Sequence, residues 1–262
     1  MTTLARMNEY TGPRAFEQAG SLVGAPAEKL VFLRKVYGLF TGSLVTAFLG
    51  AMVALYAGAD LSQIHVPVGD GRVVVPPLVA FFLNHWIIGI LLFVGSFLGA
   101  RAVRLRPGVN VVALFGASFI SGLFIAPMLF IAQIMASQGH TLSASPVRDA
   151  FVLTVLGFTG LTSYALLSKR DFSFLRGFLS MGIWVVFGAL ILNMFVGGTA
   201  FSLAIASVGV LLFGAFILFD TSRILRDPDN RDAVGAALTL YLNFLNLFVF
   251  LLRILGSSRR ES

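Results

Sequence analysis

The residues of this chain whose types could handle an ion or a proton lie in its last third. Asp220 stands in the segment FDTSR, residues 219–223, where a long apolar run ends. A carboxylate is costly in hydrocarbon unless it meets water, a cation or a proton, so an acidic residue in such a run is a functional candidate. The next apolar run carries two amides, Asn243 and Asn246, and we expect this polar patch to face Asp220.

Two chemical interpretations fit these three residues. Calcium is a hard cation that prefers oxygen ligands, so Asp220 would supply a charge, and Asn243 and Asn246 neutral carbonyl oxygens, to a calcium ion or another cation. In the other interpretation Asp220 is part of a structural latch. Its partner would be Arg223, one helical turn further on, or Arg101 at the end of the second apolar run. The two amides would then hold the last helix by interhelical hydrogen bonds.

The elements that carry these residues are membrane-spanning helices. Of the 262 residues, 57% are hydrophobic and 12% are charged, which is too apolar for a soluble domain. A bilayer core of about 30 Å needs about 20 apolar residues per helix, and barrel strands would be shorter and alternating. The runs of sufficient length are residues 32–57, 79–103, 109–135, 147–168, 174–196, 201–223 and 233–256. They predict an all-α bundle of seven transmembrane helices over residues 31–256, with an unstructured tail at 1–30 and a short tail at 257–262.

The basic residues favour one side of this bundle. Cytoplasmic loops are enriched in Lys and Arg, so we expect the amino terminus in the cytoplasm. Fourteen of the 19 Lys and Arg then lie on that side: Arg6, Arg14, Lys29, Arg34, Lys35, Arg101, Arg104, Arg106, Lys169, Arg170, Arg176, Arg223, Arg226 and Arg231. The last run either crosses fully or re-enters, and we favour a full crossing. The net charge of +7 is explained by topology and anionic headgroups, and nothing predicts nucleic-acid binding.

Two local patterns predict structure within this frame. Glycines four residues apart, Gly38 with Gly42 and Gly95 with Gly99, are typical of close helix packing in membranes. Between the first two runs, residues 64–75 hold two short β-type segments around an Asp-Gly pair, which predicts a small hairpin on the exterior side.

Three segments, taken in order, resemble the Bax inhibitor family, also called the transmembrane Bax-inhibitor-motif family. They are YALLSKRDFSFL at residues 164–175, FDT at 219–221 and LYLNFLNLF at 240–248. The resemblance extends over all seven runs. The first three runs match mainly in hydropathy and in Val36-Tyr37.

The resemblance implies a seven-helix bundle whose last helix is central, and in several members a pH-sensitive calcium leak. In that leak, two aspartates on the sixth and seventh helices share protons and gate the pore. Asp220 matches the first aspartate, whereas the second position is Asn243, so we expect part of the proton switch to be lost. Bacterial relatives of the YccA type bind and restrain the membrane protease FtsH. A bacterial inner membrane, and a role in stress response, are the expectations that follow.

The sequence does not favour an enzyme. An intramembrane aspartic protease needs two carboxylates that share a proton, and Asp220 is the one candidate we find. A zinc protease needs a motif such as HExxH, whereas His65, His85 and His140 are single, and there are no cysteines. We therefore expect no catalytic residues and no cofactor. Two functions remain: a cation leak beside the last helix, gated near Asp220, and a non-conducting regulator that binds a membrane protease.

Overall fold

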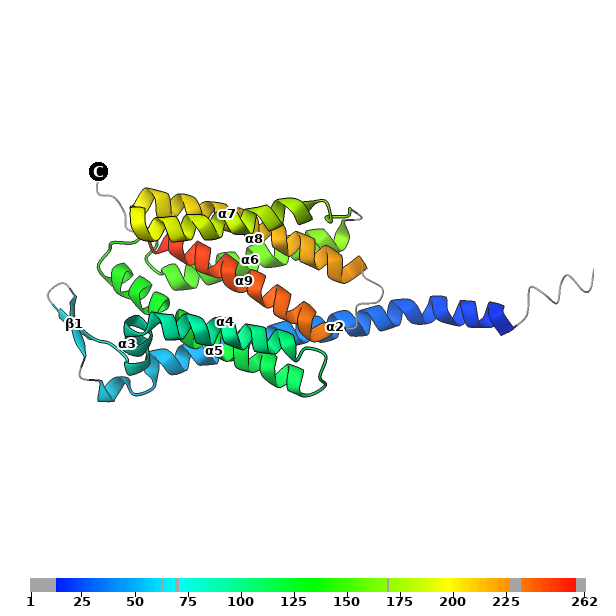
Figure 1. Ribbon diagram of the computed structural model, residues 1–262, viewed down its shortest axis with the longest axis horizontal. Coiled ribbons are helices and arrows are strands. Elements are labelled where there is room, and N and C mark those ends of the chain that lie inside the picture. The colour runs from blue at the N-terminus through cyan, green and yellow to red at the C-terminus, as the bar shows by residue number, and fades with distance from the viewer. Residues whose placement is uncertain (1–12, 63, 69–70, 169, 227–231, 258–262) are drawn as a thin grey trace, which may run out of the picture.

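The protein is an elongated helical bundle with one small β-hairpin (Figure 1). The computed structural model describes residues 13–62, 64–68, 71–168, 170–226 and 232–257. Its elements are α2 (Pro13–Tyr56), the short 3-10 helix η1 (Ala59–Leu61), β1 (His65–Val68), β2 (Gly71–Val74), α3 (Pro77–Asn84), α4 (Trp86–Ala102), α5 (Val109–Ser137), α6 (Pro146–Leu167), α7 (Leu175–Val196), α8 (Thr199–Arg226) and α9 (Ala233–Leu255). This confirms the prediction of an all-α membrane protein.

Six of these helices are long and apolar enough to cross a membrane. The predicted second run, 79–103, is not one straight helix: α3 and α4 meet at a bend of 95°. The backbone leaves helical geometry at His85, where φ is −121° and ψ is 48°. Seven spans result if the bent pair counts as one. Hydropathy did not reveal the bend, because both arms are equally apolar.

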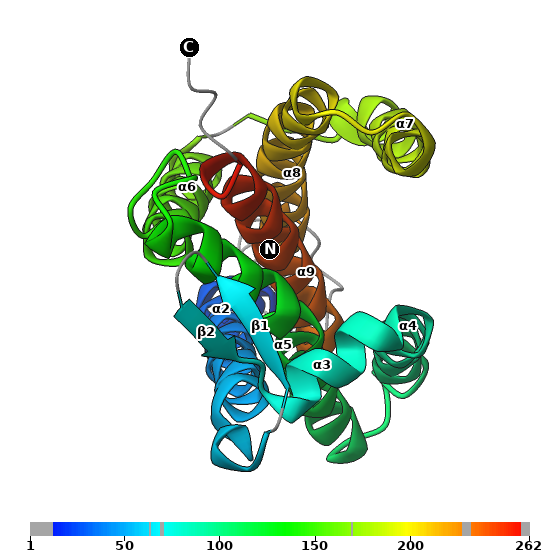
Figure 2. The same ribbon diagram turned by 90° about the vertical axis from the view of Figure 1, so that its left-hand side faces the viewer.

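α9 is the central helix of the bundle, as predicted. It packs against α8, α6, α2 and α5, and Figure 2 shows it surrounded by them. Its spanning segment is more buried than that of any other spanning helix in the described part of the chain. A helix that is apolar nearly all round is stable only when neighbours cover it, so the few polar residues of α9 need partners inside the protein.

The closest helix contact joins α2 to α5 through glycines that the sequence analysis did not single out. A Cβ atom at Gly122 would overlap the carbonyl oxygen of Ala47, and one at Gly50 would overlap that of Phe119. Among the predicted glycine pairs, a Cβ at Gly42 would lie 2.9 Å from the ring of Phe115.

The other three predicted packing glycines, Gly38, Gly95 and Gly99, face open space, so that prediction was wrong for them. A glycine pattern shows where close approach is allowed. It does not show which neighbour approaches.

The two ends of the bundle differ. The predicted hairpin is confirmed, with β1 and β2 antiparallel and His65 opposite Val74. α9 runs the length of the bundle and ends on the hairpin side, which agrees with a full crossing (Figure 1). At the opposite end α2 begins at Pro13, so helix covers much of the predicted tail at 1–30, and the first candidate span starts at Glu28. We call the end with β1 and β2 the hairpin end. We call the opposite end, where Arg101, Arg104 and Arg223 lie, the arginine end.

Candidate functional site

Asp220 and Asn243 form a buried polar pair between α8 and α9. Nδ2 of Asn243 donates a hydrogen bond to Oδ2 of Asp220 at 2.7 Å. Asp220 is 8% exposed and Asn243 5%. The two helices are adjacent and antiparallel, joined by a short connection at the arginine end, which brings positions 23 residues apart to the same depth. The expectation that Asp220 meets the last helix is therefore met at Asn243.

Asn246 is placed differently from the expected patch. Its Nδ2 donates to the carbonyl oxygen of Leu242 in its own helix at 2.7 Å, so its amide is not bonded to Asp220. It nevertheless lines the same cavity as the Asp220–Asn243 pair. One turn separates the two amides, so they mark successive depths along α9.

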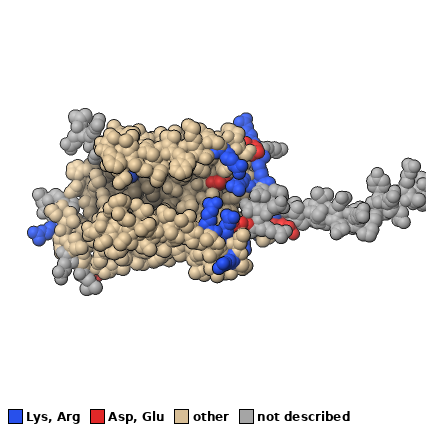
Figure 3. All heavy atoms as spheres, viewed as in Figure 1, with Lys and Arg blue, Asp and Glu red and all other residues tan. Residues whose placement is uncertain are grey.

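A cavity of about 920 Å³ adjoins the buried pair; we call it the lateral groove. α4 and α7 form its sides, and α8 and α9 its floor. Figure 2 shows α4 and α7 standing apart on either side of α9, and in Figure 3 the surface between them is hollowed, with Lys and Arg atoms gathered at the arginine end. Asp220, Asn243 and Asn246 all line the groove, so the buried carboxylate borders a space and not only packed side chains.

A second cavity, of about 1060 Å³, lies toward the hairpin end. It is bordered by α5, the first half of α4, the first turns of α8 and the second half of α9. Phe93 of α4 and Asn246 of α9 line both cavities. The two cavities are therefore neighbours beside the middle of α9, with one ring and one amide between them.

The two arginines expected as latch partners lie at the groove, but neither is ion-paired with Asp220. Arg101 and Arg223 are both exposed and both line the groove. Arg223 lies one helical turn from Asp220 in α8. Ion pairs within 4.0 Å elsewhere in the described chain include Arg104 with Asp232 and Arg148 with Asp149.

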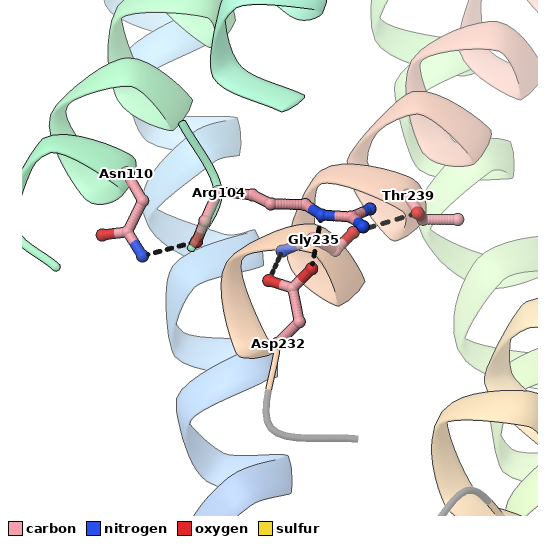
Figure 4. Close-up of polar contacts among 5 residues, drawn as sticks. All are labelled: Arg104, Asn110, Asp232, Gly235 and Thr239. Carbon is pink, nitrogen blue, oxygen red and sulfur yellow. Dashed lines mark hydrogen bonds and ion pairs between the residues drawn. The ribbon is translucent and has the colours of Figure 1, made fainter. Parts of the chain in front are cut away.

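The Arg104–Asp232 pair was missed by sequence reasoning. Nε of Arg104 lies 3.4 Å from Oδ2 of Asp232 (Figure 4). Nδ2 of Asn110 donates a hydrogen bond to the carbonyl oxygen of Arg104 at 2.8 Å. Asp232 is also the N-cap of α9, because its Oδ1 accepts a hydrogen bond from the backbone N–H of Gly235 at 2.7 Å. An aspartate just before an apolar run is a cap signal that could have been found; its arginine partner could not.

A second anchor of α9 also escaped the sequence analysis. Tyr241 is completely buried, and its hydroxyl shares a short hydrogen bond with Ser121 of α5. Phe97 of α4 stacks on its ring with centroids 6.0 Å apart. A buried tyrosine usually needs a partner for its hydroxyl, and here that partner ties α9 to α5 one residue before Leu242 and two before Asn243.

The side chains at this site limit both metal binding and proton sharing. No group of three His, Cys, Asp or Glu residues in the described ranges could hold a metal ion. Asp149 is a further carboxylate within a spanning helix, but it lies in the first turn of α6 and accepts a hydrogen bond from Ser143 at 2.5 Å. That turn is at the hairpin end, since the backbone of Ser143 bonds to that of Leu255. Asp149 and Asp220 therefore lie at opposite ends and cannot share a proton.

Comparisons with known proteins agree with the motifs. A family model described as "Inhibitor of apoptosis-promoting Bax1" matches residues 30–260. The chain is 36% identical over 224 residues to a membrane protein of Vibrio cholerae, covering 86% of this chain and 88% of that protein. It is 29% identical over 243 residues to Bax inhibitor 1 of Schizosaccharomyces pombe, covering 88% and 78%. It is also 29% identical over 233 residues to protein lifeguard 4 of Mus musculus, covering 89% and 87%. The chain belongs to the Bax inhibitor family.

Proposed function

We propose that this protein is a cation leak whose pathway follows α9 and whose gate is the Asp220–Asn243 pair. The observation that carries the proposal is a carboxylate, 8% exposed, that borders the lateral groove inside the bundle. Ionisable residues within spans mark ion or proton pathways by default. The second cavity, which shares Asn246 with the groove, would supply the remaining length of such a pathway.

The donor set favours passage of a cation over tight binding. Calcium sites gain affinity from the number of charged ligands, and this site offers one carboxylate with neutral amide oxygens near it. A single charge attracts a cation into a low-dielectric space without holding it for long. Calcium is the cation that family resemblance suggests, and the geometry equally allows a monovalent cation.

Proton control would be simple in this chain. Two adjacent carboxylates titrate as a coupled pair, whereas Asp220 beside the Asn243 amide binds one proton without such coupling. Protonation would remove the charge that attracts the cation. We therefore expect flux to fall on acidification with the shallow dependence of a single proton.

Flux into liposomes loaded with a calcium-sensitive dye tests the proposal. Wild type should pass calcium or a monovalent cation, and Asp220→Asn should reduce flux at least tenfold. Asp60→Asn is the matched control, because Asp60 is an exposed carboxylate in η1, away from the groove, and it should leave flux unchanged. Asn243→Asp should make the pH dependence steeper.

The absence of flux from folded wild type, or equal flux from Asp220→Asn, would refute the leak. The protein would then be the non-conducting regulator, and co-purification with a membrane protease of the FtsH type would support that function. Both proposals place the chain in a bacterial inner membrane with the arginine end in the cytoplasm. The chain has no cysteine, so single cysteines can report this orientation. Ala144→Cys and Ser173→Cys, at exposed positions in connections at the hairpin end and the arginine end, can each be labelled from one side of the membrane.

A further inference from the structure

The lateral groove has apolar sides that the protein itself does not cover. α4 packs mainly on α5, and α7 on α8, so the facing surfaces of α4 and α7 remain open. Val94 and Leu98 of α4 are 44% and 62% exposed, and Ile183 and Phe187 of α7 are 42% and 55% exposed. All four line the groove. In a bilayer such a surface is in contact with acyl chains.

The arginine end of the groove is polar and carries an excess of positive charge. Arg101, Arg104 and Arg223 line it, together with Asp220 and Asp232, so three positive charges face two negative ones and the sum is +1. Arg104 is paired with Asp232, and Arg223 has Asp220 one turn before it in α8. Arg101, in the last turn of α4, is the charge that these pairings leave uncompensated.

We propose that the lateral groove binds one anionic phospholipid, with its phosphate between Arg101 and Arg223 and an acyl chain between α4 and α7. A phosphodiester carries one negative charge, which matches the excess. Guanidinium groups bind phosphate through two parallel hydrogen bonds, and both arginines line the groove, Arg101 from α4 at its side and Arg223 from α8 at its floor. A zwitterionic headgroup would place an additional positive charge next to the two arginines, so an anionic lipid should bind more tightly.

The deep part of the groove suits an acyl chain. Beyond Asn243 the lining is formed by aromatic and aliphatic side chains such as Phe213, Leu190 and Val94, and Asn246 is the polar residue left at that depth. An acyl chain entering from the side would end near Asn246.

Native mass spectrometry of the full-length protein tests the proposal. Delipidated protein is mixed with equal amounts of phosphatidylglycerol and phosphatidylcholine, and the bound lipid is counted. Wild type should retain one phosphatidylglycerol in preference to phosphatidylcholine. In the double variant Arg101→Gln/Arg223→Gln the preference for phosphatidylglycerol should fall about 30-fold, since each arginine near anionic lipid raises the affinity about fivefold. Arg106→Gln is the matched control, because Arg106 is an exposed arginine on the connection that follows α4 and does not line the groove.

The acyl chain is tested separately. Leu98→Trp fills the groove and should weaken retention of both lipids while leaving the unfolding temperature near that of wild type. Glycerol phosphate, which has the headgroup anion without a chain, should not displace the bound lipid. Equal retention of the two lipids by wild type, an unchanged preference in the double variant, or displacement by glycerol phosphate would each overturn the proposal. None of these measurements depends on ion flux, so failure of the lipid site can be distinguished from failure of the leak.

Discussion

Replacing Asn243 with aspartate tests the buried pair most directly. In the wild-type protein Asn243 donates to Asp220 over 2.7 Å, and both residues are buried. The substitution removes the donor and places two carboxylates in contact. At an effective dielectric constant of about 20, two like charges about 4 Å apart repel by about 4 kcal/mol. Holding a proton on an ordinary carboxylate at pH 7 also costs about 4 kcal/mol. We therefore expect Asn243→Asp to lower the free energy of unfolding by about 4 kcal/mol at pH 7.

The loss should shrink as the pH falls. The folded variant gains by taking up one proton that the unfolded chain does not hold at neutral pH, so acid favours the folded state. Between pH 7 and about pH 5 the deficit relative to wild type should decrease by about 1.4 kcal/mol per pH unit. Unfolding in mixed detergent micelles, followed by circular dichroism at several pH values, measures both quantities.

Exchanging the two residues is the matched control. Asp220→Asn/Asn243→Asp keeps one carboxylate and one amide in contact and should recover most of the stability that Asn243→Asp loses. Together with the two single variants, this exchange completes a double-mutant cycle, which measures the coupling between residues in contact. If Asn243→Asp loses less than about 1 kcal/mol at pH 7, or if the exchange restores nothing, then the two side chains do not form the pair described here.

Two further predictions concern packing and capping. Gly122→Ala should destabilise the protein by about 3 kcal/mol or more, because its Cβ would overlap backbone of α2, whereas Gly116→Ala, which faces open space, should be neutral or slightly stabilising in the same unfolding assay. Asp232→Ala should cost about 1–2 kcal/mol through the lost cap of α9, and Arg104→Ala less than about 1 kcal/mol, because that ion pair is partly exposed. Equal losses in both members of either comparison would contradict these assignments.

The helical bundle and the Asp220–Asn243 pair could be predicted from the sequence for the same reason. Apolar runs of spanning length have few alternatives in a membrane, and a carboxylate within them needs a polar partner, which the next run supplies. Asn246 was predicted in the same patch, but its amide bonds to its own helix. Polarity alone does not decide between a neighbour and the local backbone.

The features that were missed depend on tertiary geometry. The bend at His85 changes direction without changing hydropathy, and the overlap at Gly122 depends on which face of α2 approaches α5. The Arg104–Asp232 pair joins two connections whose separation is set by the packing of whole helices. Expected partners for Asp220 were chosen by depth along the membrane, and depth does not fix the rotation of a helix about its axis.

The bend between α3 and α4 leaves a short straight helix facing the bilayer. α4 has 17 residues and spans about 25 Å at 1.5 Å per residue, less than the roughly 30 Å of an average hydrocarbon layer. The hydrocarbon layer next to α4 has to become thinner to match this length, whereas the layer beside the 28-residue α8 does not. Shorter acyl chains should therefore stabilise the α4 side of the fold, and longer ones should strain it.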